Sequence, residues 1–240
     1  MTGIRLYIDI PHDYRHAVIQ HRDSVANVLT RALRRHGWQP TKNQPARWGF
    51  GVITKPVNKT DNPKQRLYKL QRVIVGSSDP EIAAALAQIN ADDLMEDTQA
   101  PGAGLDFSVA EIYSAPDWVE TEAVNFYCVS PIRVSDPEHK IDTYLQTDDR
   151  FNLLLNRTMQ TRFQRPFHLK FTPDNLYTRL HDGDITGHMA IKMKKGQPVI
   201  LQGIIVPFLL TGPAEDLRDV WFSGLGRSSA RGFGCVELAQ

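Results

Sequence analysis

The chain has 240 residues, 41% of them hydrophobic, and a net charge of +1, which indicates a globular protein with one large domain or two small ones. The longest apolar runs are far too short to span a bilayer. Only Cys128 and Cys235 are present, without a CxxC pair, which excludes a disulfide scaffold and a cysteine zinc site. We therefore expect a cytoplasmic protein that does not enter a membrane.

Charge is distributed unevenly along the chain. Residues 1–75 carry 14 basic and 4 acidic side chains, residues 76–149 carry 2 and 16, and residues 150–240 carry 12 and 7. A chain with two basic ends and an acidic middle can fold with one strongly positive face, which attracts polyanions. Nucleic acid is therefore the leading expected partner, and an ordinary solvated surface with uneven charge is the alternative.

The first half of the chain predicts the order strand, helix, strand, strand, helix, strand. Bulky apolar residues alternate over 4–10, and an apolar stripe of helical period runs from 14 to 36, with Gly37 as a C-cap. Strand-like runs follow at 48–54 and 67–75, then a capped helix over 78–89 and a strand over 105–113. This order is the ferredoxin-like βαββαβ pattern.

The same pattern starts again after a turn-rich linker at 114–120. The expected elements are a strand over 124–134, a helix over 151–163, extended segments at 168–171, 190–193 and 199–210, a helix over 214–221 and a last strand over 232–238. The chain therefore predicts an α+β fold of two tandem ferredoxin-like domains, at 1–117 and 118–240.

The most specific motif is the glycine-rich loop at 224–234, with the sequence GLGRSSARGFG, between the last helix and the last strand. Glycine permits positive φ and lets backbone N–H groups approach an anion, while Arg and Ser add donors for phosphate oxygens. Its position excludes a nucleotide P-loop and a dinucleotide fingerprint. The motif predicts RNA or phosphate contacts from Gly224, Gly226, Arg227, Ser228, Ser229, Arg231 and Gly232.

This loop resembles the C-terminal signature of the RAMP superfamily, and most closely that of the CRISPR repeat-processing endoribonucleases, where GxGxxxxxGFG joins the last helix to the last strand. Residues 14–38, 126–134 (FYCVSPIRV) and 201–212 resemble that family in outline. The resemblance implies a tandem ferredoxin-like fold and metal-independent cutting of precursor CRISPR RNA within each repeat, with the guide RNA often kept bound. It implies no cofactor and no metal, and other subunits of an effector complex are candidate partners.

Cutting RNA without a metal requires a group that deprotonates the 2′-OH, a group that protonates the 5′-oxygen, and a cation that stabilises the charge between them. Histidine suits the first two roles because it titrates near neutral pH. On the predicted first helix, His36 and Arg22 fall on the apolar stripe and His21 lies at its edge. His36 is also well placed as a simple helix cap.

The resemblance favours a catalytic histidine in or just after this helix. We therefore expect His36 first and His21 second as catalytic histidines, with Arg22 stabilising the phosphorane. If His36 is dispensable, the alternative is an arginine set of Arg22, Arg34 and Arg231.

Further cations are candidates for RNA binding. They are Arg31, Arg34, Arg35, Lys42 and Arg47 near the first helix, Lys192, Lys194 and Lys195 in a predicted hairpin, and Arg157, Arg162 and Arg165 along and just after the 151–163 helix.

Three other interpretations remain open. A non-catalytic RAMP subunit that holds processed guide RNA would keep the loop without the histidines. An RRM-type protein needs an exposed aromatic run, for which 47–53 (RWGFGVI) is the nearest match. The acidic cluster Asp92, Asp93, Glu96 and Asp97 suggests a metal nuclease, but we expect it to be solvated.

Overall fold

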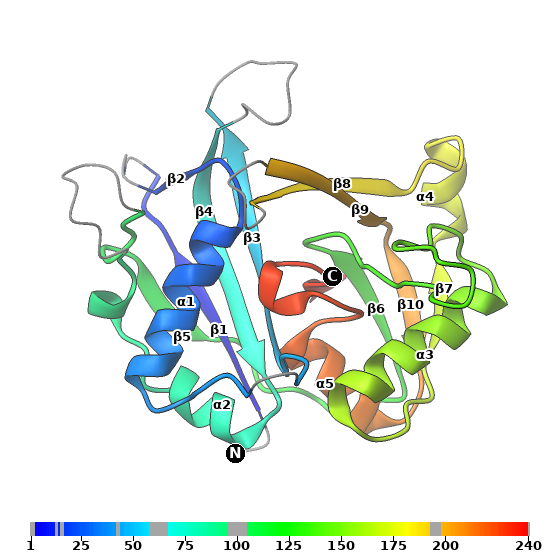
Figure 1. Ribbon diagram of the computed structural model, residues 1–240, viewed down its shortest axis with the longest axis horizontal. Coiled ribbons are helices and arrows are strands. Elements are labelled where there is room, and N and C mark those ends of the chain that lie inside the picture. The colour runs from blue at the N-terminus through cyan, green and yellow to red at the C-terminus, as the bar shows by residue number, and fades with distance from the viewer. Residues whose placement is uncertain are drawn as a thin grey trace.

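A computed structural model describes residues 3–12, 14, 17–41, 44–57, 67–95, 105–192 and 198–239, without the side chains at 192 and 198. The elements form two halves that follow one another along the chain and lie side by side (Figure 1). Within the described ranges, no helix is both long and apolar enough to cross a membrane.

The first half is a ferredoxin-like unit. Its elements are β1 (Ile4–Asp9), β2 (Val18–Ile19), α1 (Asp23–Arg35), β3 (Trp48–Pro56), β4 (Tyr68–Ser77), α2 (Pro80–Leu86), the 3-10 helix η2 (Ala91–Asp93) and β5 (Glu111–Ser114). The main strands pair antiparallel in the order β3-β4-β1-β5, and the short β2 also pairs with β4. Figure 1 shows α1 and α2 on the same side of this sheet.

The second half repeats the pattern with one insertion. Its elements are β6 (Ala123–Cys128), α3 (Asp149–Phe163), β7 (Lys170–Pro173), α4 (Asn175–Leu180), β8 (Thr186–Lys192), β9 (Pro198–Ile204), β10 (Phe208–Thr211), α5 (Ala214–Ser223), η3 (Ser229–Arg231) and β11 (Val236–Leu238). The four-stranded sheet has the order β11-β6-β10-β7, and β8 pairs with β9 in a separate two-stranded sheet. The predicted tandem ferredoxin-like fold is therefore confirmed.

The predicted helix over 14–36 is wrong in its first part, because α1 begins at Asp23. Residues 17–19 run alongside β4 instead: Val18 lies opposite Lys69, and the N–H of Leu70 donates to the carbonyl of Ala17 over 2.9 Å. Pairing with the sheet supplies the backbone hydrogen bonds that a helix would otherwise provide. The helical positions predicted for residues 18–22 therefore do not apply.

Several strand boundaries also differ from the prediction. The expected strand at 105–113 is confined to Glu111–Ser114, the one at 124–134 ends at Cys128, and the one at 232–238 begins at Val236. The extended run at 199–210 is divided into β9 and β10 around Pro207, which has no N–H to donate to a ladder. The sequence patterns gave no signal for the short helix α4.

Each half has its own hydrophobic core. One core cluster comprises buried residues between 6 and 110, the other comprises buried residues between 126 and 236, and Tyr7, Ile74 and Cys235 form a small cluster between them. Trp48 and Phe50 of the RRM-like run are buried in the first core. They therefore have no face open to RNA. The predicted domain boundary at 117/118 stays a prediction, and it falls between the two cores.

Arg162 of α3 joins the two halves. It was expected on a basic outer face, but it is only 4% exposed. Its guanidinium donates to the carbonyls of Ala46 (2.8 Å) and Trp48 (3.2 Å) in the first half, and to those of Ser223 and Gly224 (2.8 Å for Gly224) where the glycine-rich loop begins. Burial lowers the pKa of Arg162 to about 9, so the side chain stays cationic at neutral pH.

Arg5 of β1 makes a second connection, from the first half to the second. It is buried and donates to the carbonyls of Trp221 and Val236, and its guanidinium lies 4.0 Å from the ring centroid of Trp221. The end of α5 packs so closely on β3 that a Cβ at Gly49 would lie 2.3 Å from the carbonyl oxygen of Ser223. Backbone contact without intervening side chains therefore fixes the two halves together.

We predict that Arg162→Met lowers the free energy of unfolding by at least about 3 kcal/mol, because it leaves several buried carbonyls without donors. Arg157→Met on the same helix is the control, since Arg157 is 53% exposed and pairs with Glu138; it should cost less than about 1 kcal/mol. Urea denaturation measures both, and equal losses would contradict the role given to Arg162.

Candidate functional site

The glycine-rich loop lies between the two halves, as the red segment at the centre of Figure 1 shows. Its fold depends on glycine: Gly234 has φ +66, and a Cβ there would lie 1.8 Å from the carbonyl oxygen of Leu225. Gly226 is similarly enclosed, because a Cβ there would lie 2.5 Å from the carbonyl oxygen of Arg133. The loop therefore turns back tightly on itself and on residues 131–133.

Most of the loop faces inward. The N–H groups of Leu225, Arg227 and Gly234 donate to carbonyls of Gly234, Arg133 and Pro131, over 2.8 to 2.9 Å. These N–H groups are thus engaged with carbonyls of the protein. The buried members of the predicted contact set, which shape the loop, are Gly224, Gly226, Ser229 and Gly232.

Three residues of the predicted contact set reach the surface: Arg227, Ser228 and Arg231. Both arginine side chains are 39% exposed, and they pair with Asp142 at 3.4 Å and Asp23 at 3.2 Å. Surface ion pairs of this kind contribute at most about 1 kcal/mol, so a phosphate can replace either carboxylate. Two cationic side chains of the loop are therefore placed to bind an anion.

A cavity of about 560 Å³ lies beside the loop, between the start of α1 and the β8–β9 hairpin. Its lining includes His21, Arg22 and His188, of which the third was not singled out from the sequence. The Nδ1 atom of His21 is buried without a hydrogen-bond partner among the described residues. His188 lies 3.1 Å from the side-chain nitrogen of Gln202 on the neighbouring strand.

Arg22 links this cavity to the loop. It precedes α1, and its Nη1 donates to the carbonyl of Gly232 over 3.1 Å. Burial lowers the pKa of Arg22 to about 10, so it stays cationic at neutral pH. His21 and Arg22, two of the three predicted catalytic residues, therefore lie together next to the glycine-rich loop.

His36 lies at the opposite end of α1, where it is the C-cap. Its Nε2 is 2.7 Å from Oδ2 of Asp93, and the two side chains are 18% and 8% exposed. Arg35 approaches the other carboxylate oxygen at 3.4 Å. Thirteen residues of α1 separate the two ends, which at 1.5 Å per residue is about 20 Å, so His36 does not meet Arg22.

Asp93 is held as a carboxylate within the fold. Burial alone would raise its pKa, but hydrogen bonds from His36 and from the backbone N–H of Asn90 bring that pKa below its usual value. The bond from Asn90 is 3.1 Å long and belongs to a capping box that opens η2. The imidazole of His36 thus has a fixed, anionic partner.

The expectation that the acidic cluster is solvated is wrong for Asp93, which is 7% exposed. The sequence carried a signal for its position, because an Asn followed three residues later by Asp is the pattern of a capping box. Nothing in the sequence pointed to the contact with His36. Glu96 and Asp97 lie outside the described residues.

The other candidate cations are spread over both halves. Arg34 is exposed on the last turn of α1, and Arg47 pairs with Asp79 at 3.4 Å. Arg165 is engaged with Asp216 and Asp219 of α5. Lys42, Lys194 and Lys195 lie outside the described residues, as does the side chain of Lys192 at the end of β8.

No metal site is evident in the described part of the chain. Groups of three or more His, Cys, Asp or Glu side chains placed to hold an ion do not occur among these residues. Histidine and arginine side chains gather at the two ends of α1, with His21 and Arg22 at one end and Arg35 and His36 at the other.

Comparison with protein families gives one match, to the family described as CRISPR associated protein Cas6, C-terminal, over residues 114–238. A search of curated proteins finds no match.

Solved structures share the fold over nearly the whole chain. A Cas6-related protein from Pyrococcus furiosus is 15% identical, with a TM-score of 0.70 and coverage of 99% of each chain. A RAMP protein described as binding different RNA substrates is 14% identical, with a TM-score of 0.68, and a CRISPR associated protein Cas6 is 14% identical, with a TM-score of 0.62; each comparison covers 99% of this chain and 100% of the other.

Proposed function

Because the chain belongs to the Cas6 family of CRISPR-associated proteins, we propose that it is an endoribonuclease that binds CRISPR repeat hairpins and cuts precursor CRISPR RNA. In the proposed reaction the 2′-oxygen loses its proton and bonds to the adjacent phosphorus. The bond from phosphorus to the 5′-oxygen breaks, and that oxygen takes up a proton. The products are a 2′,3′-cyclic phosphate and a 5′-hydroxyl, and no metal takes part.

The contact between His36 and Asp93 is the observation that carries this proposal. A neutral imidazole whose Nε2–H donates to Asp93 presents Nδ1 as an acceptor, which is the form that a general base needs. The carboxylate also fixes the orientation of the ring and stabilises the imidazolium that forms after proton transfer. This combination supports a role for His36 beyond that of the C-cap of α1.

Arginines at the same end of α1 supply the charge that the reaction needs. Arg35 lies beside the dyad, and Arg34 is exposed one residue earlier. Guanidinium groups placed near the phosphate stabilise the charge of the pentacovalent transition state, and they bind the neighbouring phosphates. In this proposal Arg34 and Arg35 act at the cut site.

The other end of α1 is assigned to RNA binding. Arg22, Arg227 and Arg231 lie around the glycine-rich loop, and the β8–β9 hairpin borders the cavity that Arg22 lines. In this proposal these groups bind the phosphate backbone of the repeat RNA and keep the mature guide RNA bound after the cut. His21 and His188 line this cavity, and they are the competing pair for catalysis.

We predict that His36→Ala slows single-turnover cleavage of a repeat RNA by about 10² to 10⁴ with unchanged affinity, because it removes the proton-transfer group. His21→Ala, a change of the same kind at the other end of α1, should slow cleavage by less than about tenfold at saturating protein. Asp93→Asn should give an intermediate loss.

The reverse ranking, with His21→Ala inactive and His36→Ala active, would place catalysis at the cavity beside the loop. Binding of the repeat without cutting by the wild-type protein would support the alternative of a non-catalytic RAMP subunit in an effector complex.

Replacing both Arg227 and Arg231 with Ala should weaken RNA binding and lower the slope of log affinity against log salt by up to about two, since two phosphate contacts are lost. Filter binding over a range of salt concentrations measures the slope. A slope equal to that of the wild type would remove the loop from the RNA interface.

A further inference from the structure

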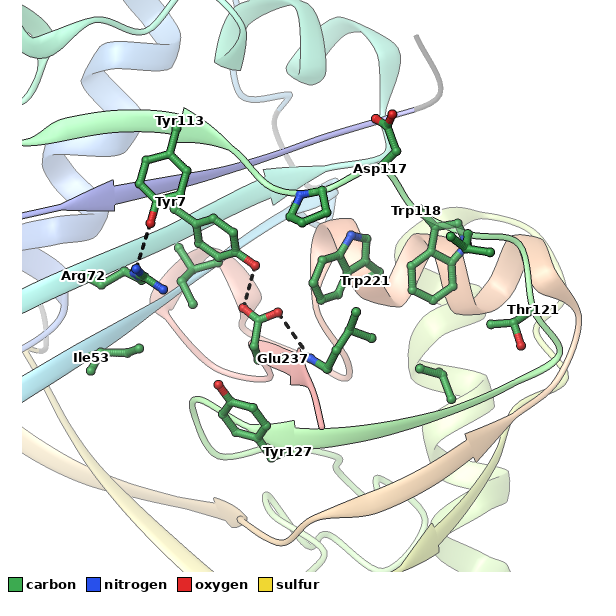
Figure 2. Close-up of a pocket in the computed structure, with 15 residues that line it drawn as sticks. Tyr7, Ile53, Arg72, Tyr113, Asp117, Trp118, Thr121, Tyr127, Trp221 and Glu237 are labelled. Atoms are coloured by element: carbon green, nitrogen blue, oxygen red, sulfur yellow. Dashed lines mark hydrogen bonds between the residues drawn. The ribbon is translucent and has the colours of Figure 1, made fainter. Parts of the chain in front are cut away.

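A second cavity, of about 810 Å³, lies between the two sheets (Figure 2). Tyr7 of β1 and Ile74 of β4 line it, whereas their strand neighbours Ile8 and Val73 point into the core under α1 and α2. Alternation along a strand sends successive side chains to opposite faces. The cavity, named here the inter-sheet groove, therefore lies on the helix-free face of the first sheet.

The inter-sheet groove is lined by large apolar side chains that remain open to solvent. Those that are more than a third exposed are Ile53, Tyr113, Val119, Tyr127 and Leu238, and Val119 is 78% exposed. These side chains come from both halves of the chain. They are therefore brought together by the fold and do not belong to a single amphipathic segment. A contiguous exposed apolar patch of this kind marks a binding surface.

Charge around the inter-sheet groove argues against RNA as its ligand. The Arg72 guanidinium is bound to the carboxylate of Asp9, and Glu237 accepts from Arg5 and from the hydroxyl of Tyr7 (Figure 2 shows the latter contact). The remaining charged side chain of the lining is the exposed Asp117. Arg72 meets Asp9 through two hydrogen bonds, unlike the single contacts of Arg227 and Arg231, so a phosphate chain entering the groove would approach carboxylates and a cation already held in a bidentate pair.

The borders of the inter-sheet groove strengthen this negative character. Glu111 on β5 and Glu122 before β6 are both exposed, and they adjoin the lining residues 113 and 121. A basic ligand would be attracted by these carboxylates. The groove therefore combines an apolar floor with an acidic rim.

The strands beside the inter-sheet groove suit an extended ligand. Among the described strands, β5 is the last of the first sheet and β11 is the last of the second. Both contribute side chains to the lining. An extended peptide can add its backbone to such a sheet edge while its side chains enter neighbouring pockets.

We propose that the inter-sheet groove docks an extended segment of a partner protein, with a large apolar or aromatic side chain flanked by Lys or Arg. The apolar side chain enters between Tyr113 and Tyr127, and the basic side chains meet Asp117 and the neighbouring glutamates. This surface is separate from the groups assigned to RNA. The proposal therefore does not depend on the endoribonuclease activity.

The test uses a phage-displayed library of random 12-residue peptides, selected against the full chain and two variants. Val119→Glu places a charge in the inter-sheet groove, and Leu180→Glu is the matched control, since Leu180 is 72% exposed on α4 and does not line the groove. Wild type and the control should enrich peptides with an aromatic or large aliphatic residue flanked by Lys or Arg. Val119→Glu should not.

An enriched peptide, measured by fluorescence anisotropy, should bind Val119→Glu and Asp117→Lys at least tenfold more weakly than the wild type. All the variants should cut repeat RNA at the wild-type rate, which separates this proposal from the one above.

Three results would overturn the proposal. The first is a selection in which no peptide class depends on Val119. The second is binding of a labelled uridine octamer that Val119→Glu abolishes, which would make the groove an RNA site. The third is a dimer in sedimentation that the same variant dissociates, which would make a second copy the occupant.

Discussion

The buried guanidinium of Arg162 is the interaction on which the arrangement of the two halves depends. A buried backbone carbonyl needs a donor. One side chain here supplies donors to carbonyls at 46 and 48 in the first half and at 223 and 224, where the glycine-rich loop begins. Three segments far apart in the sequence thus meet at one cation. Replacing Arg162 would therefore weaken the packing of the loop as well as the contact between the two halves.

The position of the loop follows from this constraint, and in the proposed function it sets where RNA binds. The loop is held against the first turn of α1 by Arg22 and Arg231, while His36 and Asp93 lie about 20 Å away at the other end. An RNA that contacts both ends must run along the exposed side of α1, past Arg34. In the proposed function, the helix sets the distance between the groups that bind RNA and the groups that cut it.

The order of elements could be predicted from the sequence because periodicity and turn chemistry are local. The errors lie where tertiary contacts override local preference. Residues 17–19 have the spacing of a helix, yet residues 18 and 19 pair with β4 as a strand. Arg162 has the sequence context of a surface residue, and only the assembled interface shows why it is buried.

The candidate site was predictable in part for the same reason. The glycine-rich loop is a sequence motif, so its tight turns could be predicted. The sequence did not show that N–H groups of the loop donate to the carbonyls of residues 131 and 133. The pairing of His36 with Asp93 joins residues 57 positions apart, which no spacing rule reveals.

The most direct test of the central claim is single-turnover incubation of the wild-type protein in EDTA with a labelled CRISPR repeat RNA from its own host. A second substrate carries one 2′-deoxy substitution at the mapped cut site. The account predicts that the first RNA is cut, with a 2′,3′-cyclic phosphate on the upstream product, and that the second is bound but intact. Cutting of the deoxy substrate, or loss of all cutting in EDTA, would contradict it.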